Sequence, residues 1–223
     1  MKAHRSFPRV DASGDAALAV RFGDAMDPKI HDQVLGFLAA LEGNRPGWIV
    51  EIVPTAHTVT IFLPPGTPHA KPAHWLGALA RTMARRRSRQ PAGRLITVPV
   101  IYGGKHGPDL NDVATFAGIS PHEVVRLHTG TEYRVYFLGF APGFPYLGRV
   151  PDAIAMPRLP IPRTRVPAGS IGIAGHQTGI YPDKSPGGWR IIGRTAIHLY
   201  DPNRRRPFLF APGDRVRFRE LAP

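Results

Sequence analysis

The feature that most constrains this chain is the interleaving of glycine and proline between residues 139 and 193. This stretch is about a quarter of the length, yet it holds 10 of the 24 glycines and 9 of the 25 prolines. Glycine permits positive φ and close backbone approach, whereas proline fixes φ and removes a hydrogen-bond donor. The stretch also carries large apolar residues such as Phe144, Tyr181 and Trp189, which a flexible linker would lack. We therefore expect rigid, ordered loops and short strands, and such loops are where binding and catalysis concentrate.

Composition limits the remaining possibilities. The 223 residues suffice for one large or two small domains, and the hydrophobic fraction of 43% is ordinary for a globular protein. There is no cysteine, which excludes disulfides, thiolate zinc sites and a cysteine nucleophile. No apolar run approaches the roughly 20 residues needed to span a bilayer, and the first 15 residues lack an apolar signal region. We expect a cytoplasmic protein that does not bind membranes.

The chain is strongly basic, with 29 Lys and Arg against 16 Asp and Glu and a net charge of +13. Two arginine clusters, at 81–94 and 203–207, raise the question of nucleic-acid binding. A nucleic-acid surface normally pairs basic residues with stacking aromatics, and neither cluster contains an aromatic residue. Ordinary solvated arginines, or a docking surface for an acidic partner subunit, explain the clusters better, so we predict no nucleic-acid partner.

Residues 1–90 are predicted to form a small α+β domain. Apolar alternation at 16–22, 48–54 and 57–64 indicates three strands. Asp27 followed by Pro28 is a typical helix start, and a second helix is expected from Pro72. The order β-α-β-β-α predicts a sandwich with helices on one face of an antiparallel sheet.

Residues 94–223 are predicted to form a second, mainly-β domain after a boundary at 90–93. A strand at 94–104 is followed by helices at 107–118 and 120–130, the second with a capping box from Ser120 to Glu123. These two helices also resemble a DNA-binding helix-turn-helix, although the second is short and not notably basic. A central strand is then expected at 132–140, and many short strands with Gly/Pro turns predict a sandwich or closed barrel. The expected short strands are 170–175, 189–193, 196–201 and 214–220.

Several common catalytic motifs are absent from the sequence. There is no G-x-x-x-x-G-K-[ST], no G-x-G-x-x-G leading into a helix and no H-E-x-x-H. The segment "AGSIG" around Ser170 resembles a nucleophile elbow, but that motif requires a strand-turn-helix context. Ser170 instead precedes a predicted strand, so we do not expect a serine hydrolase.

The remaining chemistry lies in "GHQTGIYPDKSPGG" and the proline-rich run before it. His176 is the one side chain of that segment that titrates near neutral pH. Arg158 and Arg163 are suited to bidentate recognition of a carboxylate or phosphate. Gly187 and Gly188 can bring backbone N–H groups close to an anion. Together these residues predict a site for a small anionic substrate or a phosphate, in which His176 moves a proton.

We therefore expect His176 to be catalytic and ten further residues to bind substrate or phosphate. These ten are Arg158, Arg163, Gly169, Ser170, Gln177, Thr178, Tyr181, Ser185, Gly187 and Gly188. Structural roles remain open for each of them: a hydrogen-bonding histidine, arginines in salt bridges and a tyrosine packed on the barrel. The stretch has only two carboxylates, Asp152 and Asp183, so we predict no metal site and an active site completed by another chain.

Four segments of this half resemble the B-subunit family of bacterial 5-oxoprolinase, also known as the KipI or allophanate-hydrolase-subunit-1 type. They are "YGGKHGPDL" (102–110), "FLGFAPGFPYLG" (137–148), "VPAGSIGIAGHQTGIYP" (166–182) and "SPGGWRIIGRT" (185–195). The resemblance runs from about Leu95 to Phe218, is weak over the first 90 residues, and implies a cyclophilin-like β-barrel. The sequence departs from the family at Arg149, where glycine is common, and in the hairpin at 53–62.

The resemblance implies a component of an ATP-dependent 5-oxoprolinase, which opens the small anionic lactam 5-oxoproline to glutamate. ATP would be a cosubstrate, and whether a metal accompanies it is left open. The expected partners are a cyclophilin-like C subunit and a LamB/YcsF-type A subunit, without which the chain would be inactive. Two alternatives remain: a binding module that inhibits a sensor histidine kinase, and a component of a urea carboxylase or allophanate hydrolase system.

Overall fold

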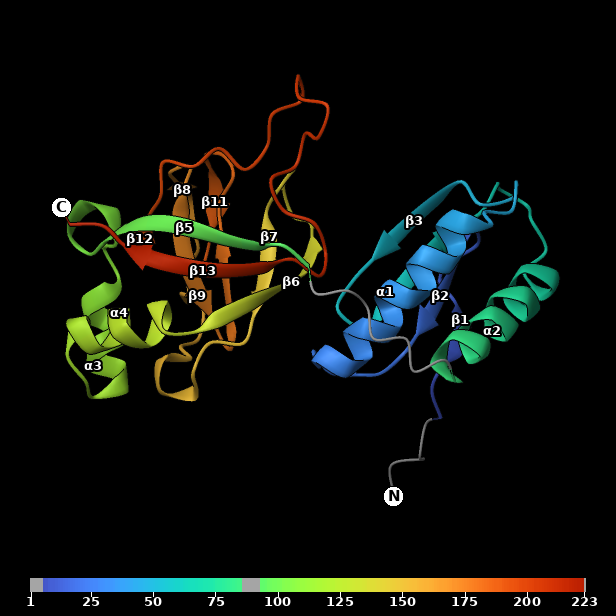
Figure 1. Cartoon of the computed structure of the whole chain (residues 1–223), viewed down its shortest axis with the longest axis horizontal. Helices are drawn as coiled ribbons and strands as arrows, with labels where there is room; N and C mark the ends of the chain where they lie inside the picture. The colour runs from blue at the N-terminus through green and yellow to red at the C-terminus, as the bar shows by residue number, and fades with distance from the viewer. Residues whose placement is uncertain (1–5, 86–92, 223) are drawn as a thin grey trace. The chain divides into compact units, whose positions relative to one another are not determined.

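Residues 6–85 and 93–222 are described by the computed structural model (Figure 1). The chain divides into two units, Met1–Pro91 and Ala92–Pro223. Arg86, Arg87 and Arg89 of the first arginine cluster lie outside the described residues, as does most of the predicted boundary at 90–93.

The first unit is a four-stranded antiparallel sheet with two helices, in the sheet order β1-β2-β4-β3. Its apolar core includes Val20, Phe37, Ile61 and Leu76, all buried. The elements are β1 (Arg9–Ala12), β2 (Ala17–Arg21), α1 (Pro28–Gly43), β3 (Glu51–Pro54), β4 (Thr58–Phe62) and α2 (Ala70–Arg85). The predicted start of the first helix is confirmed, because the Asp27 side chain accepts hydrogen bonds from two backbone N–H groups, at 2.7 and 3.2 Å.

One strand of this unit was not predicted. Strand β1 reads Arg-Val-Asp-Ala, in which Val10 is the one β-branched residue. Its place at the sheet edge is fixed by pairing with β2 and by Asp11, whose carboxylate binds both Arg9 and Arg21, at 3.1 and 2.9 Å. Four residues with a single β-branched side chain give only a weak strand signal.

The second unit is built around a closed barrel, in the described residues formed by seven strands in the order β10-β7-β6-β13-β5-β12-β9. Strands β5 and β13 pair in parallel, whereas the other neighbours are antiparallel. A two-stranded sheet of β8 and β11 lies beside the barrel. The strands are β5 (Leu95–Tyr102), β6 (Glu132–Leu138), β7 (Pro145–Gly148), β8 (Arg163–Val166), β9 (Ser170–Ala174), β10 (Gln177–Ile180), β11 (Ser185–Gly187), β12 (Arg190–Arg194) and β13 (Arg215–Glu220).

Two helices, α3 (Leu110–Ala117) and α4 (Pro121–Thr129), connect β5 to β6 (Figure 1). Helix α3 ends at Gly118 in the left-handed conformation, and the Ser120 hydroxyl caps α4 by accepting from Glu123 N at 3.1 Å. Both helices bury apolar residues in the core of the barrel unit. Short 3-10 turns at Gly104–His106 and Asp152–Ile154 complete the unit. The predicted fold class, an α+β domain followed by a β-barrel domain, is therefore confirmed.

The strand expected at 196–201 is not formed. These residues form an irregular segment, in which one bridge pairs Tyr200 with Phe208. Leu199 is nevertheless buried in the barrel core. The apolar alternation of residues 196–201 therefore reflects burial of one side of the segment. It does not indicate pairing in the sheet.

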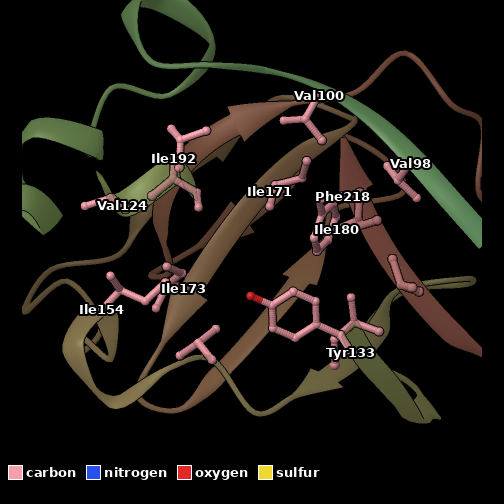
Figure 2. Packing of buried hydrophobic residues seen from close by; sticks show 14 of the residues in the cluster. Val98, Val100, Val124, Tyr133, Ile154, Ile171, Ile173, Ile180, Ile192 and Phe218 are labelled. Carbon is pink, nitrogen blue, oxygen red and sulfur yellow. The ribbon is translucent and has the colours of Figure 1, made fainter. Parts of the chain in front are cut away.

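The barrel interior is filled by side chains from nearly every strand (Figure 2). Ile171, Ile173 and Ile180 point inward beside Tyr133 and Phe218. Alternation along a strand then directs the intervening residues of β9 and β10 to the outer face of the barrel.

A buried histidine, His128 of α4, belongs to this interior. Its ring stacks on Phe218 with centroids 4.5 Å apart, and its Nδ1 lies 2.8 Å from Tyr102 Oη. Its Nε2 lies 3.1 Å from Thr178 Oγ1, which donates to the Gly172 carbonyl at 3.0 Å. Burial lowers the pKa of His128 to about 3, so the ring is neutral at physiological pH.

Candidate functional site

Paired glycines on the outer face of the barrel create the surface on which the candidate site is built. Gly172 of β9 lies opposite Gly179 of β10. A Cβ at Gly179 would lie 2.9 Å from Phe144 and from Trp189, and a Cβ at Gly172 would lie 2.9 Å from Trp189. Because neither strand has a side chain here, aromatic rings pack directly against the backbone.

These rings form what we call the outer aromatic cluster: Phe144, Tyr146, Tyr181 and Trp189. The Phe144 ring is central, with its centroid 4.9 Å from Tyr146, 5.2 Å from Tyr181 and 5.3 Å from Trp189. The contacts to Tyr181 and Trp189 are edge-to-face, the arrangement that aromatic rings favour. The glycine- and aromatic-rich stretch is therefore an ordered second layer on the barrel wall, as predicted from its composition.

Phe140 extends this cluster to the surface. Its ring meets Phe144 at 5.4 Å and Tyr181 at 6.2 Å, yet the residue is 62% exposed. Its φ of +69° lies in the left-handed region, which is unfavourable for a bulky residue and is found preferentially at functional sites. A tight turn fixes this conformation, because Gly139 N donates to the Phe144 carbonyl at 3.1 Å and Phe144 N to the Ala141 carbonyl at 3.0 Å.

Arg158 supplies positive charge to the same surface. Its guanidinium carbon lies 5.9 Å from the centroid of the Trp189 ring, a favourable cation–π distance. The backbone on either side is fixed, since Met156 forms a bridge with Gly175 and Leu159 N donates to the Gly188 carbonyl at 2.7 Å. Arg158 is exposed and is therefore accessible to an anion.

The two tyrosines of the cluster stay protonated at neutral pH. Burial raises the pKa of Tyr146, against a smaller opposing effect of the Arg158 charge. Burial also raises the pKa of Tyr181, opposed by a backbone hydrogen bond with Trp189 and by Arg158. Both phenol groups thus lie in the field of Arg158, but only Tyr146 is partly exposed, since Tyr181 is buried. This combination suits a carboxylate or phosphate attached to a small, partly apolar molecule.

Arg163 is held in an ion pair, although its charge also acts on Tyr181, whose pKa it lowers slightly. Its guanidinium donates to both Asp109 oxygens, at 2.9 and 2.6 Å. Asp109 is buried and also accepts from Ile191 N at 2.6 Å. The pair joins β8 to the start of α3, which is the structural role that remained open for this arginine.

His176 lies in the tight turn between β9 and β10, where its side chain is half-exposed. Its Nδ1 is 3.3 Å from Asp152 Oδ1, and Arg149 donates to the same oxygen at 2.6 Å. A carboxylate at Nδ1 favours the tautomer in which Nε2 is a free proton acceptor. This geometry is compatible with the predicted transfer of a proton by His176.

The other predicted site residues divide between the two faces of the barrel wall. Thr178 points inward to His128, whereas Tyr181 belongs to the outer cluster. Gln177 is half-buried at the start of β10, and Ser170 is buried at the start of β9. The predicted residues therefore do not surround a single point.

The glycines among them have packing roles. Gly169, at φ +78°, approaches the Thr195 carbonyl so closely that a Cβ would collide with it, and a Cβ at Gly187 would collide with the Tyr181 hydroxyl. The Gly188 carbonyl accepts a hydrogen bond from Leu159 N. Ser185 of β11 has a buried Oγ without a hydrogen-bond partner in the described parts of the chain.

The sequence interpretation missed four contributors to the candidate site, namely Trp189 and three residues close together in the chain. Phe140, Phe144 and Tyr146 were counted only as apolar mass, although their spacing in "GFAPGFPYLG" places all three near one turn. Pairing of β7 with β10 brings Tyr146 opposite Gly179, a contact that no local pattern reveals. Within residues 6–85 and 93–222, no helix is long and apolar enough to cross a membrane, and no three His, Asp or Glu side chains converge as a metal site.

The comparisons with known proteins agree on one family. Residues 8–210 match the family model described as "Carboxyltransferase domain, subdomain C and D". The chain is 46% identical to the 5-oxoprolinase B subunit of Escherichia coli O157:H7, over 76% of this chain and 77% of that protein. It is 38% identical to the 5-oxoprolinase B subunit of Bacillus subtilis (strain 168), over 94% of this chain and 91% of that protein.

A solved structure, the crystal structure of TTHA0988, has a TM-score of 0.79 and 38% identity. The alignment covers 93% of this chain but only 40% of that longer one. The likeness therefore extends across both units of the fold described above. With the family model matching most of its length, the chain belongs to the 5-oxoprolinase B-subunit family.

Proposed function

We propose that the chain is the B subunit of a cytoplasmic, ATP-dependent 5-oxoprolinase. The reaction converts 5-oxo-L-proline, ATP and water into L-glutamate, ADP and phosphate. Similarity to the Bacillus subtilis B subunit over 94% of this chain is the observation that carries the proposal. The word "subunit" in the names of the relatives supports a complex, with a cyclophilin-like C subunit and a LamB/YcsF-type A subunit as the proposed partners.

ATP has a clear chemical purpose in this reaction. A five-membered lactam resists water because its nitrogen donates electron density into the carbonyl group. Transfer of the terminal phosphoryl group to the lactam oxygen releases ADP and leaves a carbon that water can attack. The ring C–N bond then breaks, the nitrogen takes up a proton, and an acyl phosphate remains. A second water hydrolyses this acyl phosphate, which releases phosphate and leaves the carboxylate of glutamate.

The outer aromatic cluster with Arg158 is the proposed substrate-binding surface. Arg158 would bind the carboxylate of 5-oxoproline, and the Tyr146 hydroxyl would donate to one of its oxygens. The exposed Phe140 ring would cover the apolar side of the five-membered ring. We assign His176, oriented by Asp152, to proton transfer during ring opening.

The test is reconstitution of the three purified subunits with 5-oxoproline and ATP, with glutamate and phosphate both quantified. Arg158→Gln removes a charge-assisted hydrogen bond, which corresponds to roughly a 10- to 100-fold increase in KM for 5-oxoproline. Arg165→Gln is the matched control, since Arg165 is an exposed arginine of the same stretch, and it should change KM less than about twofold. Equal turnover with and without this chain would refute the proposal.

A second candidate, a component of a urea carboxylase or allophanate hydrolase system, is favoured by the carboxyltransferase description of the family model. The same reconstitution separates the two candidates when urea or allophanate replaces 5-oxoproline. Turnover of urea or allophanate, with none of 5-oxoproline, would establish the second candidate.

A further inference from the structure

A projecting loop of the barrel unit has features of a protein-docking surface. We call residues 200–208, between β12 and β13, the arginine hairpin. It belongs to the orange-red segment that reaches farthest from the barrel at the top of Figure 1. A bridge between Tyr200 and Phe208 closes it, and Asp201 N donates to the Pro207 carbonyl at 2.9 Å. Its tip, residues 202–206, is exposed throughout.

The tip is held in one conformation by a single carboxylate. Asp201 accepts from Asn203 N at 3.0 Å and from Arg204 Nε at 3.0 Å. Ordering of the loop in advance lowers the entropic cost of binding a partner. The hairpin therefore presents its side chains on a defined frame.

Two adjacent arginines of the hairpin are unpaired. Neither Arg205 nor Arg206 has an ion-pair or hydrogen-bond partner within residues 6–85 and 93–222. Two other arginines of the barrel are paired, since Arg215 and Arg217 share Glu132, at 3.0 and 3.3 Å. Two neighbouring guanidiniums thus remain available to carboxylates outside the chain.

The base of the hairpin adds exposed aromatic surface. Tyr200 and Phe208 are 38% and 42% exposed, and their ring centroids are 5.1 Å apart. Tyrosine, phenylalanine and arginine are the residues enriched at the centres of protein interfaces. Apolar rings beside free guanidiniums match a partner with a small apolar contact bordered by carboxylates.

Nucleic acid fits the hairpin less well. A single strand requires rings with open faces and a row of cations along its phosphates. Here the two rings lie against each other at an interplanar angle of 31°, and the Asp201 carboxylate stands among the arginines. A second copy of this chain is also a poor partner, because a net charge of +13 makes the two copies repel.

We propose that the arginine hairpin docks an acidic surface of the partner subunit that completes the enzyme. This inference rests on the proposed function for the identity of the partner. The contact would consist of Arg205 and Arg206 bound to carboxylates, with the Tyr200 and Phe208 rings packed on an apolar contact. Electrostatic attraction of this kind speeds association and weakens with added salt.

The test is calorimetric titration of this chain with the cyclophilin-like C subunit of the same genome, at two salt concentrations. Arg205→Glu with Arg206→Glu should weaken binding about tenfold or more, with the greater loss at low salt. The matched control is Arg81→Glu with Arg219→Glu, which changes the net charge equally at exposed arginines elsewhere. Binding by the control should stay within about threefold of the wild type.

Two results would overturn the inference. One is an equal effect of the hairpin and control variants on binding. The other is hairpin-dependent binding of a fluorescent 20-nucleotide single strand together with unchanged binding of the protein partner, which would show a nucleic-acid surface.

Failure of the wild type to bind the cyclophilin-like C subunit would count against the proposed function, and the hairpin is then tested separately. Wild-type and hairpin-variant chains are used to capture proteins from the native cell lysate. Identical captured proteins overturn the inference. An acidic protein that is captured only by the wild type, and that shows the same arginine dependence after purification, supports it.

Discussion

Acidification should weaken the barrel through His128, which the fold keeps neutral. The unfolded chain binds a proton at this histidine below its ordinary pKa of 6.5, whereas the folded chain does so only near pH 3. A depressed histidine pKa therefore makes stability fall with pH across this window, by about 1.4 kcal/mol per pH unit. At pH 4.5 the loss from this one group is about 2.7 kcal/mol relative to neutral pH.

The measurement compares wild type with His128→Gln, since glutamine cannot titrate but can still hydrogen-bond Tyr102 and Thr178. Both chains carry Trp48→Phe and Trp75→Phe, which leaves Trp189 as the sole tryptophan and as the reporter of the barrel unit. Urea unfolding is then followed by fluorescence between pH 7 and pH 4.5. The variant should start about 1–3 kcal/mol less stable, and the two stability curves should converge as the pH falls.

The difference between the two curves is the informative quantity, because it cancels the titration of the other histidines and the carboxylates. The neighbouring Tyr102 and Tyr133 do not contribute in acid, since burial raises the pKa of both. A wild-type-to-variant difference that stays constant from pH 7 to pH 4.5 would refute the reasoning. Such a result would mean that His128 is hydrated or already charged in the folded barrel.

Three further predictions concern the packing of the barrel unit. Asp109→Asn should destabilise it by about 3–5 kcal/mol in urea unfolding, because it leaves Arg163 half-buried without its partner, whereas Asp152→Asn, at the exposed pair with Arg149, should cost under about 1 kcal/mol. Gly179→Ala should cost about 1–3 kcal/mol by forcing the rings away from the strand, and an unchanged melting temperature would contradict that packing. Phe140→Gly should leave stability equal or raise it by about 1 kcal/mol, since it removes an unfavourable φ, while it raises KM for 5-oxoproline; a large loss of stability would show that the ring serves packing alone.

Local chemistry in the sequence predicted much of the fold. Asp27 and Ser120 predicted the starts of their helices, because a helix cap depends only on neighbouring residues. Both caps are present in the structure. Strand β1 escaped prediction because it has only four residues and a single β-branched side chain, and the ion pairs of Asp11 with two arginines give no local signal. The strand predicted at 196–201 was wrong, because this segment alternates polar and apolar residues but does not join the sheet.

The candidate site was harder to predict because its parts meet across the barrel wall. The motif around His176 includes Tyr181 of the outer aromatic cluster, but alternation sends Thr178 inside and leaves Gly179 outside. Arg163 and Asp109 are 54 residues apart, so their pairing could not be inferred from spacing. The buried state of His128 was equally hidden, since its partners come from β5, β10 and β13.

The position of β13 in the barrel determines when the barrel unit can finish folding. This strand lies between β5 and β6, pairing in parallel with one and antiparallel with the other. Before Arg215–Glu220 leave the ribosome, β5 and β6 lack the strand that joins them, and open strand edges favour aggregation. The first unit can fold during synthesis, but the barrel can close only after translation has passed Glu220.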